Sequence, residues 1–245
     1  MRWRKDSQIH NWLPRLQAHR GYWVEGLQQN SLKSIQKAFE LKFEMAEFDV
    51  RITKDDVVVL FHDESYQGKP LHQMTFEEFK IKSADEYPDT VTLENVLGWL
   101  KDLKKQNIQR DFKLNIEIKS KKIFSSRLEF QVNRLIEKFQ LAHSVLISSF
   151  NPFSLYRFRK MAPQIYRALL LTNDKESNFI LNQMWFNFLC VPDVLHLRRV
   201  DFSLSKYAKI DVPIVLWTVN ALSEIQDFKT GIFGVISDRI TPDLF

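Results

Sequence analysis

Two hydrophobic patterns alternate along the chain and predict strands separated by helices. Eight short apolar runs have the length and composition of buried strands. They lie at 16–20, 46–50, 114–119, 144–150, 167–171, 193–197, 213–219 and 234–238. The segments between them have helical spacing, so the order is that of successive βα units, which build a parallel sheet. Eight units predict an α/β fold of the TIM (β/α)8 barrel type, with active sites at the carboxyl ends of the strands.

Capping residues mark where several helices begin. A Ser, Thr or Asn at the N-cap accepts hydrogen bonds from free backbone N–H groups of the first turn. The predicted starts are Ser31, Thr75 with Glu78, Ser126 with Glu129, and Asn151 followed by Pro152. We expect a seventh helix around 221–229 that ends near Gly231. The short tail after 238 leaves no room for a full eighth helix, and we expect segment 6–14 to cover that gap instead.

A ninth apolar run, 57–62, does not fit the simple repeat. It follows strand 46–50 so closely that a parallel crossover cannot connect the two, and only a hairpin can. A turn at 54–56 would pair position 53 with 57 and position 49 with 61. The run is therefore predicted as a small hairpin insertion after strand 2, which brings His62 beside Asp49 at the barrel mouth.

Composition narrows the class of protein. The 245 residues, 44% of them hydrophobic, suit one domain spanning 1–245. The single cysteine, Cys190, cannot form an internal disulfide and fits a reducing compartment. No apolar run reaches the roughly 18 residues of a membrane span, and the N-terminus lacks the apolar region of a signal peptide. We expect a cytoplasmic protein.

The net charge of +5 is diffuse. Short basic clusters at 101–106 and 119–122 are typical of solvated helix faces, and no nucleic-acid motif accompanies them. We expect no nucleic-acid partner, and at most a mild attraction for phosphate-bearing ligands. Peripheral membrane contact through Arg2, Trp3 and Arg4 stays open, as does the oligomeric state.

Charged residues interrupt two of the predicted strands. Side chains alternate along a strand, so Glu47 and Asp49 share one face, and Glu117 and Lys119 share another. Burying such groups is costly unless they are paired or bind a metal. Three carboxylates without a nearby cysteine suit a hard cation such as Mg²⁺ or Ca²⁺. With Arg20 and Lys119 the set carries one net negative charge, and a divalent ion would make it positive enough to attract a phosphodiester.

Histidines at strand ends supply candidate proton-transfer groups. His19 and Arg20 end the first strand, and the following Gly21 leaves room for a ligand to approach the backbone. A lone histidine on a strand is more often structural. That interpretation is given to His10, His72, His143 and His196. Arg198 and Arg199 follow the sixth strand at the functional face, where they could touch the substrate, but solvated ion pairs are the expectation for them.

Five segments together resemble the glycerophosphodiester phosphodiesterase family. They are "AHRG" (18–21), "EFDVRITKDDVVVLFHD" (47–63), "NIEIK" (115–119), "ISSFNP" (147–152) and "VLWTVN" (215–220). The resemblance implies a barrel of the phosphatidylinositol-phospholipase-C-like type that hydrolyses glycerophosphodiesters to sn-glycerol 3-phosphate and an alcohol. It implies a divalent cation held by Glu47, Asp49 and Glu117, either Mg²⁺ or Ca²⁺, with Mn²⁺ as an alternative.

The same resemblance assigns the remaining site residues. His19 and His62 would be the acid–base pair, Arg20 and Lys119 would hold the phosphate, and Trp217 would line the substrate pocket. Among the departures from the family pattern, Gln29 stands where a carboxylate is usual, and Asp56 stands at a turn glycine. Gln29 would either coordinate the metal through its carbonyl oxygen or hydrogen-bond Arg20.

Several alternatives remain open at this point. Either histidine could be the acid, and either water or the glycerol 2-hydroxyl could be the nucleophile. A lysophospholipase D activity would use Trp12, Trp23 and phenylalanines at the mouth to hold an acyl chain. A non-catalytic barrel that binds phosphorylated ligands is the third reading, and Gln29 is its support.

Overall fold

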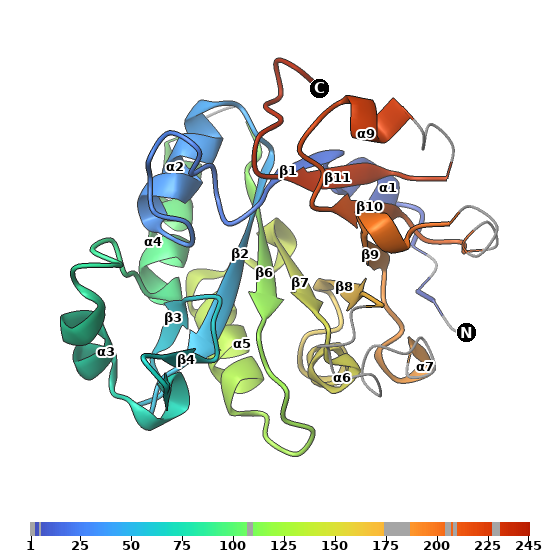
Figure 1. Cartoon of the computed structure of the whole chain (residues 1–245). Coiled ribbons are helices and arrows are strands. Elements are labelled where there is room, and N and C mark those ends of the chain that lie inside the picture. Colours follow the sequence, from blue (N-terminus) through green and yellow to red (C-terminus); the bar gives the residue numbers. More distant parts are fainter. Residues whose placement is uncertain are drawn as a thin grey trace.

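Eight parallel strands close into a barrel in the computed structural model (Figure 1), which describes residues 3–4, 6–106, 110–173, 187–203, 207, 210–226 and 231–245. The barrel strands are β1 (Leu16–Ala18), β2 (Met45–Ile52), β6 (Lys113–Ile118), β7 (Val145–Ser149), β8 (Tyr166–Leu171), β9 (Val194–Arg198), β10 (Ile214–Trp217) and β11 (Gly234–Ser237). Strand β1 pairs in parallel with both β11 and β2, which closes the sheet. The eight predicted strands are confirmed, with small differences at their ends.

Helices connect the strands and cover the outer face of the barrel (Figure 1). Their apolar residues pack against the outward side chains of the strands, as Leu93, Leu97 and Leu100 do in the main core cluster. The helices are α2 (Leu32–Glu40), α3 (Phe76–Ser83), α4 (Leu93–Lys105), α5 (Arg127–Phe139), α6 (Pro152–Met161), α7 (Asn187–Cys190) and α9 (Ser223–Gln226), with short 3₁₀ turns η1 (Leu71–Gln73), η2 (Ala142–Ser144) and η4 (Arg199–Asp201). Helix α9 occupies part of the range predicted for the seventh helix, and positions 227–230 lie outside the described residues.

Three of the four predicted helix caps are confirmed. The side chains of Ser31, Thr75 and Asn151 accept hydrogen bonds from backbone N–H groups of α2, α3 and α6. The prediction for α5 is wrong, because Ser126 makes no capping hydrogen bond. Its expected partner Glu129 is buried and instead accepts hydrogen bonds from Ser154 and Arg157 of α6. A sequence signature cannot reveal such a competing partner on a neighbouring helix.

Strand β3 (Val58–Leu60) runs antiparallel to the end of β2 in the register that the turn predicts. The backbone N–H of Phe61 donates to Asp49 O at 3.1 Å, which sets His62 at the mouth of the barrel. Asp56 has a positive φ of 66°, the conformation for which a glycine is usual at this turn. The short strands β4 (Ser65–Tyr66) and β5 (Lys69–Pro70) follow. A small apolar cluster joins β3, β4 and α3, and it is made by Val59, Phe61, Tyr66, Leu71, Met74 and Phe79.

Helix α1 (Ile9–Trp12) closes the amino-terminal end of the barrel. Ile9 and Leu13 lie on one face of the segment, four positions apart, and are buried at 2% and 3% exposure. They pack on the inward residues Met45, Leu146, Ala168, Val194, Val215 and Ile236. The expectation that 6–14 covers the outer gap is therefore wrong, since the open end of the barrel offers this apolar face a more complete burial.

Two of the three N-terminal residues considered for membrane contact make other interactions in the structure. Trp3 packs against the core, and Arg4 donates to Pro163 O and pairs with Asp193. Arg2 lies outside the described residues. Within the described part of the chain, helices are too short or too polar to cross a bilayer.

Candidate active site

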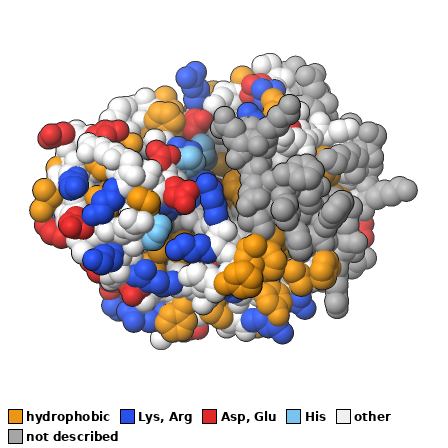
Figure 2. Space-filling model, turned by 60° about the horizontal axis from the view of Figure 1, so that its bottom comes forward, with side chains coloured by type: hydrophobic (Ala, Val, Ile, Leu, Met, Phe, Trp, Pro, Cys, Tyr) orange, Lys and Arg blue, Asp and Glu red, His pale blue; other side chains and the backbone are white. Residues whose placement is uncertain are grey.

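A cavity of about 220 Å³ lies at the carboxyl ends of the strands. Histidine, acidic and basic side chains gather on this face of the molecule (Figure 2). The cavity is lined by His19, Arg20, Glu47, Asp49, His62, Glu117, Lys119, Ser148, Phe150, Leu170, His196, Trp217, Thr218 and Ile236. All eight residues that the sequence selects as catalytic, substrate-binding or metal-binding are in this set.

Three buried carboxylates form one wall of the cavity. Asp49 and Glu117 are paired positions on β2 and β6, and Glu47 lies two residues before Asp49 on the same face. One oxygen from each lies within 4.8 Å of the others. Their exposed fractions are 6% or less. Strand alternation and the β2–β6 register thus bring together the acids predicted to converge.

The protonation chemistry of this cluster fits a bound cation. Burial, with the charge of Asp49, raises the pKa of Glu47 to about 8, and burial also raises the pKa of Glu117. Oxygen Oε1 of Glu47 is buried without a hydrogen-bond partner among the described residues. A divalent cation would neutralise the mutual repulsion and use this free oxygen. The three carboxylates could therefore hold a metal ion.

Two basic side chains flank the acids. Lys119 Nζ lies 3.1 Å from Asp49 Oδ1 and 2.7 Å from Glu117 Oε1, and Arg20 Nε lies 3.3 Å from Asp49 Oδ2. Burial opposes ionisation of Asp49, but these two cations outweigh it and lower its pKa. Arg20 also donates from Nη1 to Gln29 Oε1 at 2.8 Å. Of the two roles open to Gln29, the structure shows the hydrogen bond to Arg20.

His19 is held by an aspartate from the last strand of the barrel. Its Nδ1 lies 2.7 Å from Oδ1 of Asp238, which directly follows β11, and its Nε2 lies 3.9 Å from Glu47 Oε2. Burial would lower the pKa of His19, but the hydrogen bond to Asp238 and the charge of Glu47 outweigh it and raise that pKa. A carboxylate on Nδ1 fixes the ring and leaves Nε2 for proton transfer.

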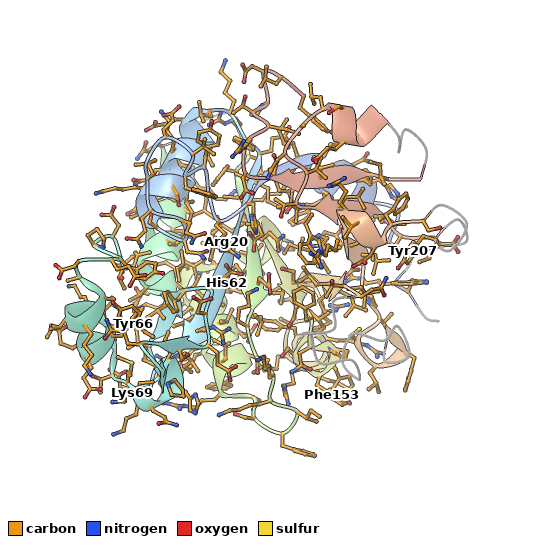
Figure 3. All side chains as sticks on the ribbon, in the orientation of Figure 1. Arg20, His62, Tyr66, Lys69, Phe153 and Tyr207 are labelled. Carbon is orange, nitrogen blue, oxygen red and sulfur yellow. The ribbon has the colours of Figure 1, made fainter. Side chains whose placement is uncertain are left out.

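His62 has a similar but more exposed arrangement. Its Nδ1 lies 2.7 Å from Asp63 Oδ1, and its side chain is 42% exposed. Burial and the nearby charge of Lys119 lower its pKa. Arg20 and His62 both border the cavity, although Arg20 follows β1 and His62 follows β3 (Figure 3). The two imidazoles thus reach one cavity, each with Nδ1 beside a carboxylate.

The opposite wall is largely apolar. Phe150 and Trp217 meet edge to face with ring centroids 5.6 Å apart, and Leu170 and Ile236 lie beside them. His196 of β9 also lines this wall and is fully buried. The structural role expected for His196 does not explain why it lines the cavity. His196 lies two positions after Val194 on the same strand, and this spacing indicates that its side chain is on the inward face. A single histidine on a strand, however, carries no sequence signal of a functional role.

Other residues singled out in the sequence lie away from the cavity. Gly21 faces Ser34 of α2, where an added Cβ would come within 2.4 Å of Oγ, so the expected approach of a ligand is wrong. Trp12 lies at the amino-terminal end and donates to His143 O, so it cannot hold an acyl chain at the mouth. Arg199 forms the expected ion pair, with Glu224 at 3.3 Å.

Asp238 is the site residue that the sequence analysis misses. Its partner His19 is 219 positions away, and only closure of the barrel between β1 and β11 makes them neighbours. The available signal is the place of Asp238 at the carboxyl end of the last apolar run, which in a closed barrel adjoins the first.

Comparisons with known proteins agree with this geometry. A family model described as the glycerophosphoryl diester phosphodiesterase family matches residues 19–241. A glycerophosphodiester phosphodiesterase of Caldanaerobacter subterraneus is 27% identical over 243 residues, which cover 90% of this chain and 92% of the relative.

Solved structures share the fold. A phosphodiesterase of Oleispira antarctica in complex with the product sn-glycerol-3-phosphate superposes with a TM-score of 0.74 at 20% identity, covering 94% of this chain and 95% of the other. A glycerophosphodiester phosphodiesterase of Thermotoga maritima superposes with a TM-score of 0.67 at 24% identity, covering 92% and 95%. With a family model matched along almost its entire length, the chain belongs to the glycerophosphoryl diester phosphodiesterase family.

Proposed function

We propose that the protein hydrolyses glycerophosphodiesters to sn-glycerol 3-phosphate and an alcohol with the help of a divalent cation. The observation that carries this proposal is the convergence of three carboxylates, two carboxylate-held histidines and two cations on one cavity. A phosphodiester monoanion needs a positive site, and a poor alkoxide leaving group needs a proton. Membership of the phosphodiesterase family supports the same reaction.

In this proposal Glu47, Asp49 and Glu117 hold the cation, which is Mg²⁺, Ca²⁺ or Mn²⁺. The bound cation supplies Lewis acidity and offsets negative charge on the phosphoryl oxygens. Arg20 and Lys119, which already lie beside Asp49, bind and orient the phosphate. Trp217 forms the apolar side of the substrate pocket.

His19 and His62 would share the proton transfers. Both hold their Nδ1 against an aspartate, so a neutral ring accepts a proton at Nε2 and a protonated ring donates one there. One ring activates the nucleophile, water or the glycerol 2-hydroxyl, and the other protonates the leaving oxygen. On the 2-hydroxyl route the first product would be a cyclic phosphate, which water would then open to glycerol 3-phosphate. Each contributes about 10²–10⁴-fold.

The test is release of glycerol phosphate from glycerophosphocholine by the purified protein. We expect EDTA to abolish turnover and one of Mg²⁺, Mn²⁺ or Ca²⁺ to restore it. H19A and H62A should remove nearly all turnover, while H143A at the other end of the barrel should not. Full activity of the H19A/H62A double variant would exclude the mechanism. Tight binding of substrate without turnover under every metal would instead support a non-catalytic barrel.

A leaving group that needs no proton distinguishes the two histidines. With glycerophospho-4-nitrophenol, the variant of the general acid should recover most of its activity, because nitrophenolate departs unprotonated. The variant of the general base should remain inactive with both substrates. Equal recovery of H19A and H62A would contradict a division of labour between the rings.

A lysophospholipid substrate is the second candidate. The loop after β6 exposes Ile123 at 39% and Phe124 at 98%, next to the exposed Lys121 and Lys122. Apolar and basic side chains together suit an anionic lipid surface. A higher rate on lysophosphatidylcholine than on glycerophosphocholine, reduced by F124S, would favour this substrate, and the opposite order would favour the water-soluble diester.

We also propose that residues 1–245 form one domain that acts in the cytoplasm. Cys190 is the single cysteine of the sequence and so forms no internal disulfide, which suits a reducing compartment. Fractionation of cells that express the tagged protein would test the location. Limited proteolysis that yields one resistant fragment of nearly full length would support the single domain.

A further inference from the structure

His196 is a buried polar group that the proposed reaction does not use. It lies on β9 with 0% exposure and lines the cavity between the apolar residues Leu170 and Ile236. Among the described residues, neither Nδ1 nor Nε2 of the ring has a hydrogen-bond partner. A buried polar group without a partner is rare in proteins and costs stability, so its presence at a cavity wall calls for a ligand.

A second unpartnered donor lines the same wall. Nε1 of Trp217 is buried and, within the described residues, also lacks a hydrogen-bond partner. Buried tryptophan N–H groups usually find an acceptor. Two side chains on the adjacent strands β9 and β10 thus line one cavity, and each carries a buried polar atom without a hydrogen-bond partner among the described residues.

The charge of His196 restricts what it can bind. Burial lowers its pKa to about 3, so the ring is neutral at physiological pH. A neutral imidazole offers one donor and one acceptor, which matches a hydroxyl group that both donates and accepts. Phosphate oxygens chiefly accept and are better served by Arg20 and Lys119, which lie by Asp49.

We propose that His196 is a specificity-determining residue that hydrogen-bonds a hydroxyl group of the substrate's glycerol moiety, with Trp217 Nε1 as an additional donor. This inference rests on the proposed function, because it names which half of the phosphodiester enters the cavity. The glycerol side lies against the His196 wall, and the departing alcohol lies toward the mouth. Phosphodiesters whose retained half lacks hydroxyl groups are then poor ligands.

The test compares two ligands that differ only in hydroxyl groups. sn-Glycerol 3-phosphate and n-propyl phosphate carry the same phosphate and the same number of carbons. We expect calorimetry on the metal-loaded protein to show tighter binding of the glycerol compound. H196L should reduce the ratio of the two affinities about tenfold, which corresponds to the loss of one hydrogen bond to a buried neutral group. H196N, which keeps a donor and an acceptor, should retain part of it.

H143L is the matched control, since it makes the same replacement at an exposed position on the other end of the barrel, and it should leave the preference unchanged. Chemical denaturation should show H196L to be no less stable than the wild type. An unchanged preference in H196L, an equal loss for both ligands, or a wild-type protein without preference would each overturn the proposal. Failure of the proposed function would instead appear in a different measurement, as absence of phosphodiester turnover by the wild type.

Discussion

His19 and His62 each have an aspartate at Nδ1, but the two aspartates differ in burial. The side chain of Asp238 is 17% exposed and that of Asp63 is 63% exposed. The Asp238 hydrogen bond is therefore shielded from water, and it is more effective in fixing the orientation and tautomer of its ring.

We predict that D238N lowers kcat by about 100-fold with little change in KM, because His19 loses the carboxylate that sets its tautomer. D63N should lower kcat only a few-fold, since water can replace the exposed aspartate. Steady-state kinetics of both variants, with circular dichroism as a check on folding, provide the measurement. Equal losses in the two variants would mean that burial of the aspartate does not matter.

The contrast between Glu117 and Asp238 shows what the sequence can predict at this scale. Glu117 lies in a strand with clear alternation and within a motif of the family, so its face and its neighbours follow from local sequence. The role of Asp238 depends on a contact across the whole barrel. His196 is inward by alternation, but its missing partners become visible only once every neighbouring side chain is placed.

Two helices of equal length begin differently. Thr92 caps α4 by accepting from the backbone of Asn95, whereas Ser126 before α5 makes no capping hydrogen bond. The signature Ser126–Glu129 predicts a cap from sequence. The buried contacts of Glu129 with α6 prevail because they satisfy a carboxylate that would otherwise be unpaired.

T92A should therefore lower the free energy of unfolding by about 1 kcal/mol, the usual value of an N-cap. S126A should change it by less than about 0.5 kcal/mol, because no capping bond is lost. Urea denaturation of the two variants against the wild type measures both values. Comparable losses would indicate that Ser126 caps α5 in solution.

Helix α1 stabilises the barrel from the end opposite the active site. Leu13 is 3% exposed and belongs to the apolar cluster that α1 forms with the inward residues of the strands. L13A should therefore lower the free energy of unfolding by about 2–5 kcal/mol. At a temperature where the variant remains folded, kcat should match the wild type, because the cavity lies at the other end. A large fall in kcat with little loss of stability would contradict this separation.

The location of α1 also shows a limit of sequence patterns. Spacing of Ile9 and Leu13 indicates a one-faced apolar segment but not the surface that it covers. The barrel strands, by contrast, are buried on both faces, and their order along the chain fixes their neighbours.

At the scale of the whole molecule, the buried neutral His196 links folding to pH. Its pKa is about 3 in the folded protein, against 6.5 for an exposed histidine. Between these values the unfolded chain binds a proton that the folded chain excludes, so stability falls as pH falls through this window. Above pH 6.5 both states are neutral there, and the effect disappears.

H196L removes this source of acid sensitivity. We expect the free energy of unfolding of H196L, relative to that of the wild type, to rise by about 3 kcal/mol between pH 7 and pH 4. Urea unfolding at the two pH values gives the four free energies required. H143L serves as the control, and parallel pH profiles of H196L and the wild type would contradict a neutral buried ring.

Closure of the barrel through β1 and β11 has a consequence for biosynthesis. A chain still attached to the ribosome can expose both imidazoles and all three metal-binding acids long before position 238 has been translated. Until then β1 lacks one of its two neighbours, and the His19 ring has no anchor at Nδ1. Hydrolytic competence would thus arise only when the first and the last strand of the barrel meet, and a premature stop just before Asp238 would leave His19 without its anchor in an otherwise assembled site.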